Sequence, residues 1–421
     1  MLIQAPRGTR DVLPGESRMW QDMERRMRDA AALAGYREIR TPVFEHTELF
    51  SRGVGDTTDI VQKEMYTFRD KGDRSLTLKP EGTAGAVRCF LEHGLQSDPL
   101  PCKMYYLNAP VFRYEAPQKG RLREHHQFGM ECFGAAEATA DAELIILAER
   151  LLGSLGIPGL SVHINSIGCP ECRAVYHEKL RAYLAGRLDG LCGVCRERFD
   201  RNPLRVLDCK EEKCKAMLAD APSVLDTLCG GCREHFESLK RCLDAAGQRY
   251  EIDSRIVRGL DYYTRTVFEI ITETDGSPLT VCGGGRYDRL IEQLGGPSIP
   301  AVGFGMGLER VLMLLPSDSR GDESIFDAFV TYAGEHACDA FSLVQALRGN
   351  GLRADMDHCG RSLKAQFKFA NKTNAPVTLT VGDEEAAQHT VRIKNMRTGE
   401  DRCVPADDAA RAVKEIADSI G

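Results

Sequence analysis

Alternation of apolar and polar residues predicts β-strands in two separate parts of the chain. The first part has strand-like runs over residues 75–80, 103–115 and 126–134, and the charged sequence APQKGRLREHH lies between the last two. This arrangement predicts antiparallel strands joined by a long loop, and such loops are often functional. The second part includes a run rich in Val, Ile, Phe and Tyr over residues 257–272 and ends in the glycine-rich segment 301–315.

Helix-compatible sequence precedes, interrupts and follows these strands. Residues 16–35 are polar and helix-compatible, and Pro42 then stands among β-forming residues, which indicates an edge or an irregular strand. Residues 169–243 combine helix-compatible segments with nine of the sixteen cysteines, so we interpret them as an inserted domain. Strand and helix patterns alternate after Phe326, which predicts a separate α/β domain.

Length and composition limit the class of protein. The 421 residues exceed one ordinary core, and about 150 residues per domain suggests roughly three domains. The chain is 43% hydrophobic and 28% charged, and no apolar run approaches the ~18 residues that a membrane span needs. The amino terminus lacks the apolar region of a secretory signal, so we expect a cytoplasmic protein with reduced or metal-bound cysteines. A net charge of -7 argues against a general nucleic-acid coat protein but allows local basic surfaces.

Charged residues gather around the predicted hairpin between Ala109 and Glu131. Arg113 and Glu115 fall on one face of their strand, because side chains alternate with period two. Lys119, Arg121 and Arg123 follow in the connecting loop. On these residues alone, a solvated hairpin and a binding site are equally good interpretations.

The segment AVGFGMGLERVLMLL combines a glycine-rich strand with an apolar helix. Gly303, Gly305 and Gly307 alternate along the strand, so one face has no side chains and a ligand or backbone can lie against it. The helical stripe that follows from Leu308 leaves Glu309 and Arg310 off the expected buried face. A dinucleotide fingerprint would need glycine at position 308, and the chain has no Walker sequence, so any phosphate site relies on arginines.

Several of these sequences together resemble one known family. TPVFEHTELF around Pro42, FRYE at residues 112–115 and GMGLERV at 305–311 resemble, in order, the three motifs of class II aminoacyl-tRNA synthetases. RGLDYYTRTVFE at 258–269 and GGGRYD at 283–288 resemble the two histidine signatures of histidyl-tRNA synthetases. LKPEGTAGAVR and PQKGRLREHHQFGMECFG resemble that family as well, and the similarity spans essentially the whole chain.

The resemblance implies an α+β catalytic domain with an antiparallel sheet flanked by helices, a mainly helical cysteine-rich insertion and a carboxy-terminal α/β anticodon-binding domain. The expected boundaries are 1–168 and 244–318 for the two parts of the catalytic domain, 169–243 for the insertion and 325–421 for the anticodon-binding domain. It implies a homodimer, with Pro42 and its surroundings at the interface. The implied activity is ATP-dependent ligation of L-histidine to its tRNA through histidyl-adenylate, with Mg²⁺ entering together with ATP.

The same resemblance assigns roles to individual residues. Arg113 and Arg258 would act at the reacting centre and at the bound amino acid. The other residues expected around histidine are Glu81, Thr83, Gln127, Glu131, Tyr263 and Tyr287. ATP would contact Arg113 and, in addition, Glu115, Arg121, His125 and Arg310. The tRNA would contact Gln118, Lys119 and Arg123 in the loop and Arg361, Lys364 and Lys368 in the last domain.

Two positions depart from the family pattern. His125 stands where the family usually carries a phenylalanine that stacks on adenine. Imidazole also stacks but titrates near its unperturbed pKa of about 6.5, so we expect weaker ATP binding at acidic pH. Ala116 replaces an arginine common after the glutamate of the second motif, which leaves the phosphate or tRNA contacts at that corner open.

The cysteine spacing of the insertion is typical of zinc ribbons. The first expected quartet is Cys169, Cys172, Cys192 and Cys195, and a second candidate quartet is Cys209, Cys214, Cys229 and Cys232. Family relatives carry only some of these cysteines, so structural zinc and a metal-free domain are both open on the sequence.

A basic stripe is predicted on a helix of the last domain. Lys364, Lys368 and Lys372 share one helix face with Arg361, and Ser362 is a suitable N-cap. A solvated amphipathic helix explains the stripe equally well by itself, and the resemblance to an anticodon-binding domain favours tRNA. The alternative for the whole chain is a catalytically silent paralogue, such as the regulatory subunit of ATP phosphoribosyltransferase. Such paralogues typically lose the histidine signatures and the anticodon domain, both of which this chain retains.

Overall fold

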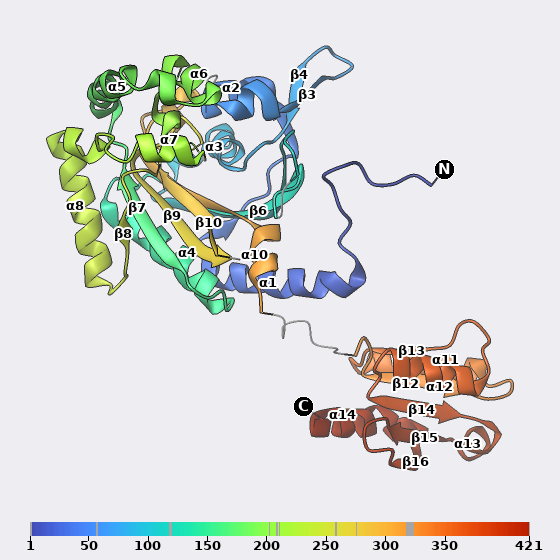
Figure 1. The fold of residues 1–421 in the computed structure, drawn as a ribbon. Helices are drawn as coiled ribbons and strands as arrows, with labels where there is room; N and C mark the ends of the chain where they lie inside the picture. The colour runs from blue at the N-terminus through green and yellow to red at the C-terminus, as the bar shows by residue number, and fades with distance from the viewer. Residues whose placement is uncertain are drawn as a thin grey trace. The chain divides into compact units, whose positions relative to one another are not determined.

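The computed structural model describes residues 2–55, 58–117, 120–201, 203–207, 209, 211–256, 259–274, 276–316 and 324–420, with only the backbone at 201 and 420. The chain divides into two compact units, residues 1–319 and 320–421, and each is described by itself (Figure 1). None of the described helices is long and apolar enough to cross a membrane.

A large sheet forms the centre of the first unit. Among the described residues its eight strands are β1 Arg37–Glu38, β5 Cys102–Phe112, β6 Glu124–Phe133, β7 Ser161–Ser166, β8 Glu251–Ile252, β9 Thr264–Thr274, β10 Ser277–Arg286 and β11 Ala301–Gly307. They lie in the order β1-β5-β6-β11-β10-β9-β7-β8. The pairings from β5 through to β7 are antiparallel, and only the short edge strands β1 and β8 pair in parallel. The expected antiparallel sheet, in which β5 and β6 pair and a long loop joins them, is confirmed.

One face of this sheet is covered by long helices. These helices are α1 Pro14–Leu33, α4 Ala138–Ser154 and α8 Gly230–Ala245. Their apolar side chains share one core with the sheet, represented by Trp20 and Met27 of α1, Ile145 of α4 and Leu239 of α8. The helix predicted over 16–35 is therefore confirmed, and its buried residues recur at helical spacing.

The opposite face carries short helices and a small sheet. The helices are α2 Thr47–Val54, α3 Thr83–Glu92 and α9 Leu290–Gln293, whereas α10 Leu308–Leu314 joins the core that the sheet shares with α1 and α4. The small sheet has the order β2-β4-β3, with β2 Phe44–His46, β3 Tyr66–Arg69 and β4 Ser75–Leu78. Pro42 lies between β1 and β2 in irregular backbone, as expected for a residue without a backbone N–H donor. The tyrosines of the histidine signatures are buried between the large sheet and α3 with α9.

The cysteine-rich insertion is helical, as expected (green in Figure 1). Its helices are α5 Pro170–Ala185, α6 Gly193–Arg201, α7 Glu212–Met217 and α8. It has a small core of its own, in which Tyr176, Leu180 and Leu184 of α5 pack against Cys195 and Cys214. Helix α8 packs instead on the core of the large sheet, so the insertion is fastened to the catalytic unit by its last helix.

The second unit is an α/β domain, as expected. Its strands are β12 Ala328–Tyr332, β13 Ala354–Met356, β14 Val377–Val381, β15 Thr390–Asn395 and β16 Asp401–Pro405, and its helices are α11 Ala337–Gly349, α12 Leu363–Lys372, α13 Asp383–Gln388 and α14 Ala409–Ile420. The sheet order is β13-β12-β14-β15-β16. The first three strands are parallel and the last two antiparallel to their neighbours.

Candidate active site

Glu81 and Thr83 stand where the chain enters helix α3. The Glu81 carboxylate accepts hydrogen bonds of 2.8 Å from the backbone nitrogens of Thr83 and Ala84, which satisfies two free N–H groups of the first turn. Glu81 is only 3% exposed, and burial raises the pKa of its carboxyl group. Helix α3 therefore presents a carboxyl group and a hydroxyl group to the same buried space.

Glu131 of β6 lies at the bottom of that space and is fully buried. The Thr83 hydroxyl donates to its carboxyl at 2.8 Å, the Tyr106 hydroxyl donates at 3.3 Å, and the Tyr287 hydroxyl donates to its other oxygen. Burial raises the pKa of Glu131 to about 8, although these hydrogen bonds act in the opposite direction. A carboxyl group that changes charge near neutral pH, surrounded by hydroxyls, is suited to a ligand with both a donor and an acceptor.

Three tyrosines form the wall of the same pocket. The ring centroid of Tyr262 lies 4.8 Å from that of Tyr263 and 5.5 Å from that of Tyr287. The Tyr262 hydroxyl reaches the Glu81 carboxylate at 3.5 Å. Tyr263 and Tyr287 were expected here, whereas Tyr262 and Tyr106 were missed. The adjacent tyrosines at 262 and 263 were a signal for one of them, and nothing in the sequence around Tyr106 marked the other.

The glycine strand β11 makes room for this pocket in two ways. A Cβ at Gly303 would overlap the Glu131 carboxyl group, because the two residues are directly paired across β11 and β6. A Cβ at Gly305 or Gly307 would meet no atom of the structure within 4 Å. The expected open face of the glycine strand is therefore confirmed. The Glu131 carboxyl group fills the space at Gly303, and the space at Gly305 and Gly307 is open. Gln127 of β6 is paired with Gly307 and lies beside this open end.

Arg113, Glu115 and Arg121 form the charged arm next to the pocket. Arg113 donates to the Pro80 carbonyl at 2.9 Å, and Arg121 donates to the Glu115 carboxylate at 2.6 Å. Burial and the neighbouring Arg121 lower the pKa of Arg113. The positive charges of these two arginines favour binding of an anion beside them.

Glu64 belongs to this arm and was missed from the sequence. The pKa of its carboxyl group is raised, mainly by burial. The charge of Arg113 opposes this shift, and the charge of Glu115 adds to it. One of its oxygens, Oε2, is buried without a hydrogen-bond partner among the described residues. An unpaired buried oxygen beside arginines is suited to a bound ligand. Glu64 ends a π-helical turn from Ile60 to Glu64, and only this position in the folded chain shows that it lies near the arginines.

His125 is buried at 9% exposure on the strand that carries Gln127. Its Nδ1 lies 3.2 Å from the Leu122 carbonyl. Burial lowers its pKa to about 4, with a further contribution from Arg113. We expected His125 to titrate near pH 6.5 and so to weaken ATP binding in acid. This expectation is corrected, because the folded protein keeps the imidazole neutral well below pH 6.5.

Glu309 and Arg310 open helix α10 beside the second motif. Arg310 donates to the Thr280 carbonyl at 2.6 Å, and its Cα lies 3.4 Å from the Cβ position of Gly120. Glu309 was expected off the buried face, and this was wrong, since it is 8% exposed. Its carboxylate accepts from the His126 backbone nitrogen at 3.0 Å and contacts His126 Nδ1 at 2.7 Å. Helix α10 is thus locked to strand β6 by hydrogen bonds as well as apolar packing.

The remaining loop residues are only partly described. Gln118, Lys119 and Arg258 lie outside the described residues. Arg123 donates to the Glu115 carbonyl at 3.2 Å and stacks over the Tyr114 ring at 4.2 Å.

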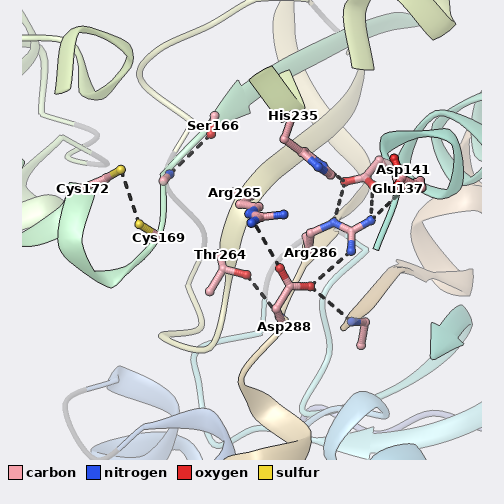
Figure 2. Close-up of polar contacts among 12 residues, drawn as sticks. Glu137, Asp141, Ser166, Cys169, Cys172, His235, Thr264, Arg265, Arg286 and Asp288 are labelled. Carbon is pink, nitrogen blue, oxygen red and sulfur yellow. Dashed lines mark hydrogen bonds and ion pairs between the residues drawn. The ribbon is translucent and has the colours of Figure 1, made fainter. Parts of the chain in front are cut away.

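A buried ion pair supports the second histidine signature. Arg286 and Asp141 are both fully buried, and the guanidinium donates to both carboxylate oxygens (Figure 2). His235 of α8 lies 3.4 Å from Asp141, and Asp288 lies 3.2 Å from Arg286. Burial opposes ionisation of Asp141, but Arg286 and His235 offset it and hold its pKa at about 2. This network fixes the backbone on both sides of Tyr287.

The cysteines pair differently from the spacing-based expectation, which was wrong. The outer quartet consists of Cys169, Cys172, Cys229 and Cys232, and the inner quartet consists of Cys192, Cys195, Cys209 and Cys214. The physical reason is that α5 and α8 begin side by side at the base of the insertion. Their CxxC sequences therefore meet each other, and the segments between them close on themselves.

The basic stripe of the second unit lies on helix α12, with Ser362 at the N-cap as expected. Arg361, Lys364, Lys368 and Lys372 are exposed, whereas Ala370 is buried. Arg361 also forms an ion pair of 3.3 Å with Asp357, which lies before the helix.

An antiparallel sheet with arginines in the connection between β5 and β6, followed by a glycine strand and an arginine-bearing helix, is the arrangement of the class II aminoacyl-tRNA synthetases. A family model described as histidyl-tRNA synthetase matches residues 8–311, and an anticodon binding domain model matches residues 327–416. The chain belongs to the histidyl-tRNA synthetase family.

Individual relatives agree with this assignment. The chain is 55% identical to the histidine–tRNA ligase of Alkaliphilus oremlandii over 421 residues, covering 99% of each chain. It is 55% identical to that of Caldanaerobacter subterraneus over 419 residues, covering 98% of this chain and 100% of the relative. The crystal structure of the apo histidyl-tRNA synthetase of S. aureus is similar with a TM-score of 0.82 and 37% identity, covering 98% and 100%.

Proposed function

We propose that this chain joins L-histidine to its tRNA in two steps. A carboxylate oxygen of histidine attacks the α-phosphorus of ATP, and the bond to the bridging oxygen of the β-phosphate breaks, which gives histidyl-adenylate and pyrophosphate. A hydroxyl of the terminal ribose of the tRNA then attacks the acyl carbon and loses its proton, and AMP leaves. The full-length identity to histidine–tRNA ligases supports this reaction.

The single observation that carries the choice of histidine is the buried Glu131 with its hydroxyl neighbours. A neutral imidazole has one N–H donor and one acceptor nitrogen. The Glu131 carboxylate accepts the N–H, and a tyrosine hydroxyl of the pocket donates to the other nitrogen. An amino acid without these groups leaves buried polar atoms unpaired, which opposes its binding. Glu81, Thr83 and Gln127 hold the α-amino group, with Tyr263 and Tyr287 around the ring.

The arginines perform the adenylate chemistry in this proposal. Arg113, in the charged arm, lies at the α-phosphate, where negative charge builds up during the attack. Arg258 serves the same centre from the first histidine signature. Glu115 and Arg121 hold the adenine amino group and the outer phosphates, and His125 and Arg310 lie on the two sides of adenine. Magnesium enters with ATP as part of the substrate.

The tRNA contacts fall in two places. Gln118, Lys119 and Arg123 serve the acceptor end, where histidine tRNA carries its extra 5′ guanosine. Arg361, Lys364 and Lys368 contact phosphates of the anticodon stem, and their exposure on α12 supports this.

A homodimer in the cytoplasm completes the proposal. Beside Pro42, Val43 is 40% exposed and Phe44 is 51% exposed, and the Phe44 ring contacts that of Phe68, which is 43% exposed. Such an apolar patch favours burial against a second copy of the chain. The cytoplasm is supported by the cysteines, because all sixteen lie among the described residues and none of them is in a disulfide.

Pyrophosphate exchange into ATP tests this function, with each of the twenty amino acids supplied in turn and no tRNA present. We expect exchange with histidine alone. Exchange with none of them, from protein that is folded and binds ATP, would favour the silent regulatory paralogue. That alternative has less support, because the chain retains both histidine signatures and the anticodon binding domain.

A further inference from the structure

The thiols of the insertion form two compact groups with the dimensions of metal sites. In the outer quartet, Cys169 Sγ lies 3.5 Å from Cys172 Sγ and 3.9 Å from Cys229 Sγ. In the inner quartet, Cys192 Sγ lies 3.9 Å from Cys209 Sγ. A zinc ion at the centre of a sulfur tetrahedron, with Zn–S bonds of about 2.3 Å, requires sulfurs about 3.8 Å apart. The ligand atoms of each group all lie within 4.8 Å of one another.

We propose that the insertion binds two structural zinc ions, one in the outer quartet and one in the inner quartet. Each ion takes four thiolates and no water, which is the closed coordination of a structural site.

Backbone geometry at both quartets supports ligation. The Cys229 backbone nitrogen donates to Cys172 Sγ at 3.0 Å, and the Cys192 nitrogen donates to Cys214 Sγ at 3.3 Å. Such N–H groups stabilise a sulfur that carries negative charge. In the outer quartet, Cys169 and Cys229 are the N-caps of α5 and α8, where the helix dipole also favours thiolates.

Metal binding explains the two cysteine quartets better than disulfides or ordinary packing do. A disulfide needs sulfurs about 2.05 Å apart, and two disulfides leave no reason for four thiols to converge. Packing alone explains clusters of large apolar side chains such as the one around the inner quartet, whereas the apolar residues that cluster with the outer quartet among the described residues are Leu225 and Leu228. A domain with so small a core gains much of its stability from a bound metal.

The outer site lies at the base of both histidine signatures. The Gly168 carbonyl, next to Cys169, accepts from the Arg265 backbone nitrogen at 2.9 Å, and Arg265 lies 4.0 Å from Asp288 (Figure 2). Arg173, next to Cys172, donates to the Asp261 carbonyl at 3.4 Å. A metal that fixes the starts of α5 and α8 therefore also fixes the backbone around the tyrosine pocket.

The inner site holds a different part of the insertion. It fixes the start of α6 and the turn after it, from which Arg198 and Arg205 reach Asp59 at 3.5 Å and 3.3 Å. Losing the inner metal should free these arginines and leave the contacts of Gly168 and Arg173 in place.

Metal content of protein expressed with zinc and purified without chelator tests the proposal. We expect two zinc ions per chain in the unchanged protein, and one in each of the variants Cys172→Ser and Cys195→Ser. Cys338→Ser, an exposed thiol of the second unit, should keep two. Less than one zinc per chain, or iron in its place, in the unchanged protein would overturn the proposal. So would loss of both ions in each folded single variant, because the quartets would then not be independent.

A second measurement does not depend on variants that fold. Replacement of zinc by Co²⁺ in the unchanged protein should give the intense visible bands of tetrahedral thiolate sites, with two equivalents needed for saturation. Weak bands, or saturation at one equivalent, would contradict two tetrathiolate sites.

The effect on catalysis rests on the proposed function and is measured separately. Cys172→Ser should raise the KM for histidine in pyrophosphate exchange at least tenfold, and Cys195→Ser should raise it less. If zinc is present but exchange is absent in the unchanged protein, the proposed function fails and the metal sites stand.

Discussion

Gly303 and Glu131 face each other across strands β11 and β6, and the Glu131 carboxyl group occupies the space that a side chain at position 303 would fill. The glycine strand of the third motif is therefore part of the amino-acid pocket. The strand that leads into this motif therefore leaves the Glu131 carboxyl group its space because residue 303 has no Cβ.

Gly303→Ala should disturb the pocket directly. The added methyl group displaces the Glu131 carboxyl, so we expect the KM for histidine to rise at least tenfold and the free energy of unfolding to fall by about 1–3 kcal/mol. Pyrophosphate exchange and urea unfolding measure the two effects. Gly305→Ala is the matched control for stability, because its Cβ meets no atom within 4 Å. Equal stability of the two variants would contradict the overlap.

Glu131→Gln should change how stability depends on pH. The folded state raises the pKa of Glu131 from 4.5 to about 8, so its contribution to stability is present below pH 4.5 and is lost as pH rises through 8. Relative to the variant, the unchanged protein should lose up to about 5 kcal/mol over that window. Urea unfolding at several pH values measures this difference. Glu335→Gln, at an exposed position, should follow the unchanged protein, and a flat difference for Glu131→Gln would contradict the raised pKa.

His125→Phe should matter for stability in acid and not for ATP binding near neutrality. The pKa of His125 falls from 6.5 to about 4 on folding, so its contribution to stability is present above pH 6.5 and is lost as pH falls through 4. The variant should therefore be more acid-resistant, by up to about 3 kcal/mol. The ratio of the two KM values for ATP should stay constant from pH 6 to pH 8. A change in that ratio around pH 6.5 would show that the imidazole titrates with ligand bound.

Asp141→Asn should destabilise the catalytic unit strongly. It removes the fully buried anionic partner of Arg286 and leaves the contact with Asp288, and loss of such a buried partner typically costs about 3–5 kcal/mol. The exposed pair of Asp22 with Arg25 provides the comparison, and Asp22→Asn should cost less than about 1 kcal/mol. Thermal unfolding of both variants measures this contrast. Similar costs would mean that the buried network does not depend on the charge of Asp141.

The double variant Lys364→Ala, Lys368→Ala should separate the two reactions. We expect unchanged pyrophosphate exchange but weaker tRNA binding, with a slope of affinity against salt reduced by about two. Aminoacylation at several salt concentrations measures the KM for tRNA. Lys394→Ala, on strand β15 of the same unit, is a control outside the basic stripe. An equal loss in both proteins would indicate general electrostatic attraction in place of a specific face.

The sheet and the pocket were predictable from the sequence where a residue's neighbours along the chain determine its place. Alternation fixed the hairpin of β5 and β6, and helical spacing fixed α1. Glu309 was misplaced because its helical position suggested solvent, whereas its partner His126 is 183 positions away in sequence. Glu64 was missed for the same reason, since the Arg113 and Glu115 side chains beside it come from a distant part of the chain. Tyr106 was missed although its partner Glu131 lies on the neighbouring strand β6.

The cysteine pairing shows the limit of spacing rules most clearly. The gap between Cys172 and Cys192 fits a zinc ribbon, and a local rule has no reason to prefer the more distant Cys229. Tyr176 and Leu180 of α5 pack in the core of the insertion, so the helix continues to Ala185. The chain therefore reaches Cys192 far from the start of α5, where Cys169 and Cys172 lie. The packing of the helices thus determines which cysteines come together, and the spacing of cysteines in the sequence does not report this packing.

The nesting of the inner quartet within the outer one also bears on how the chain is made. Cys169, Cys172, Cys192 and Cys195 are the first four thiols of the insertion to leave the ribosome, and they have ribbon spacing but the wrong partners. A metal ion captured at that moment has to exchange before Cys229 and Cys232 can close the base. The order of synthesis thus offers a metal ion a set of four thiols that do not form one quartet in the finished fold.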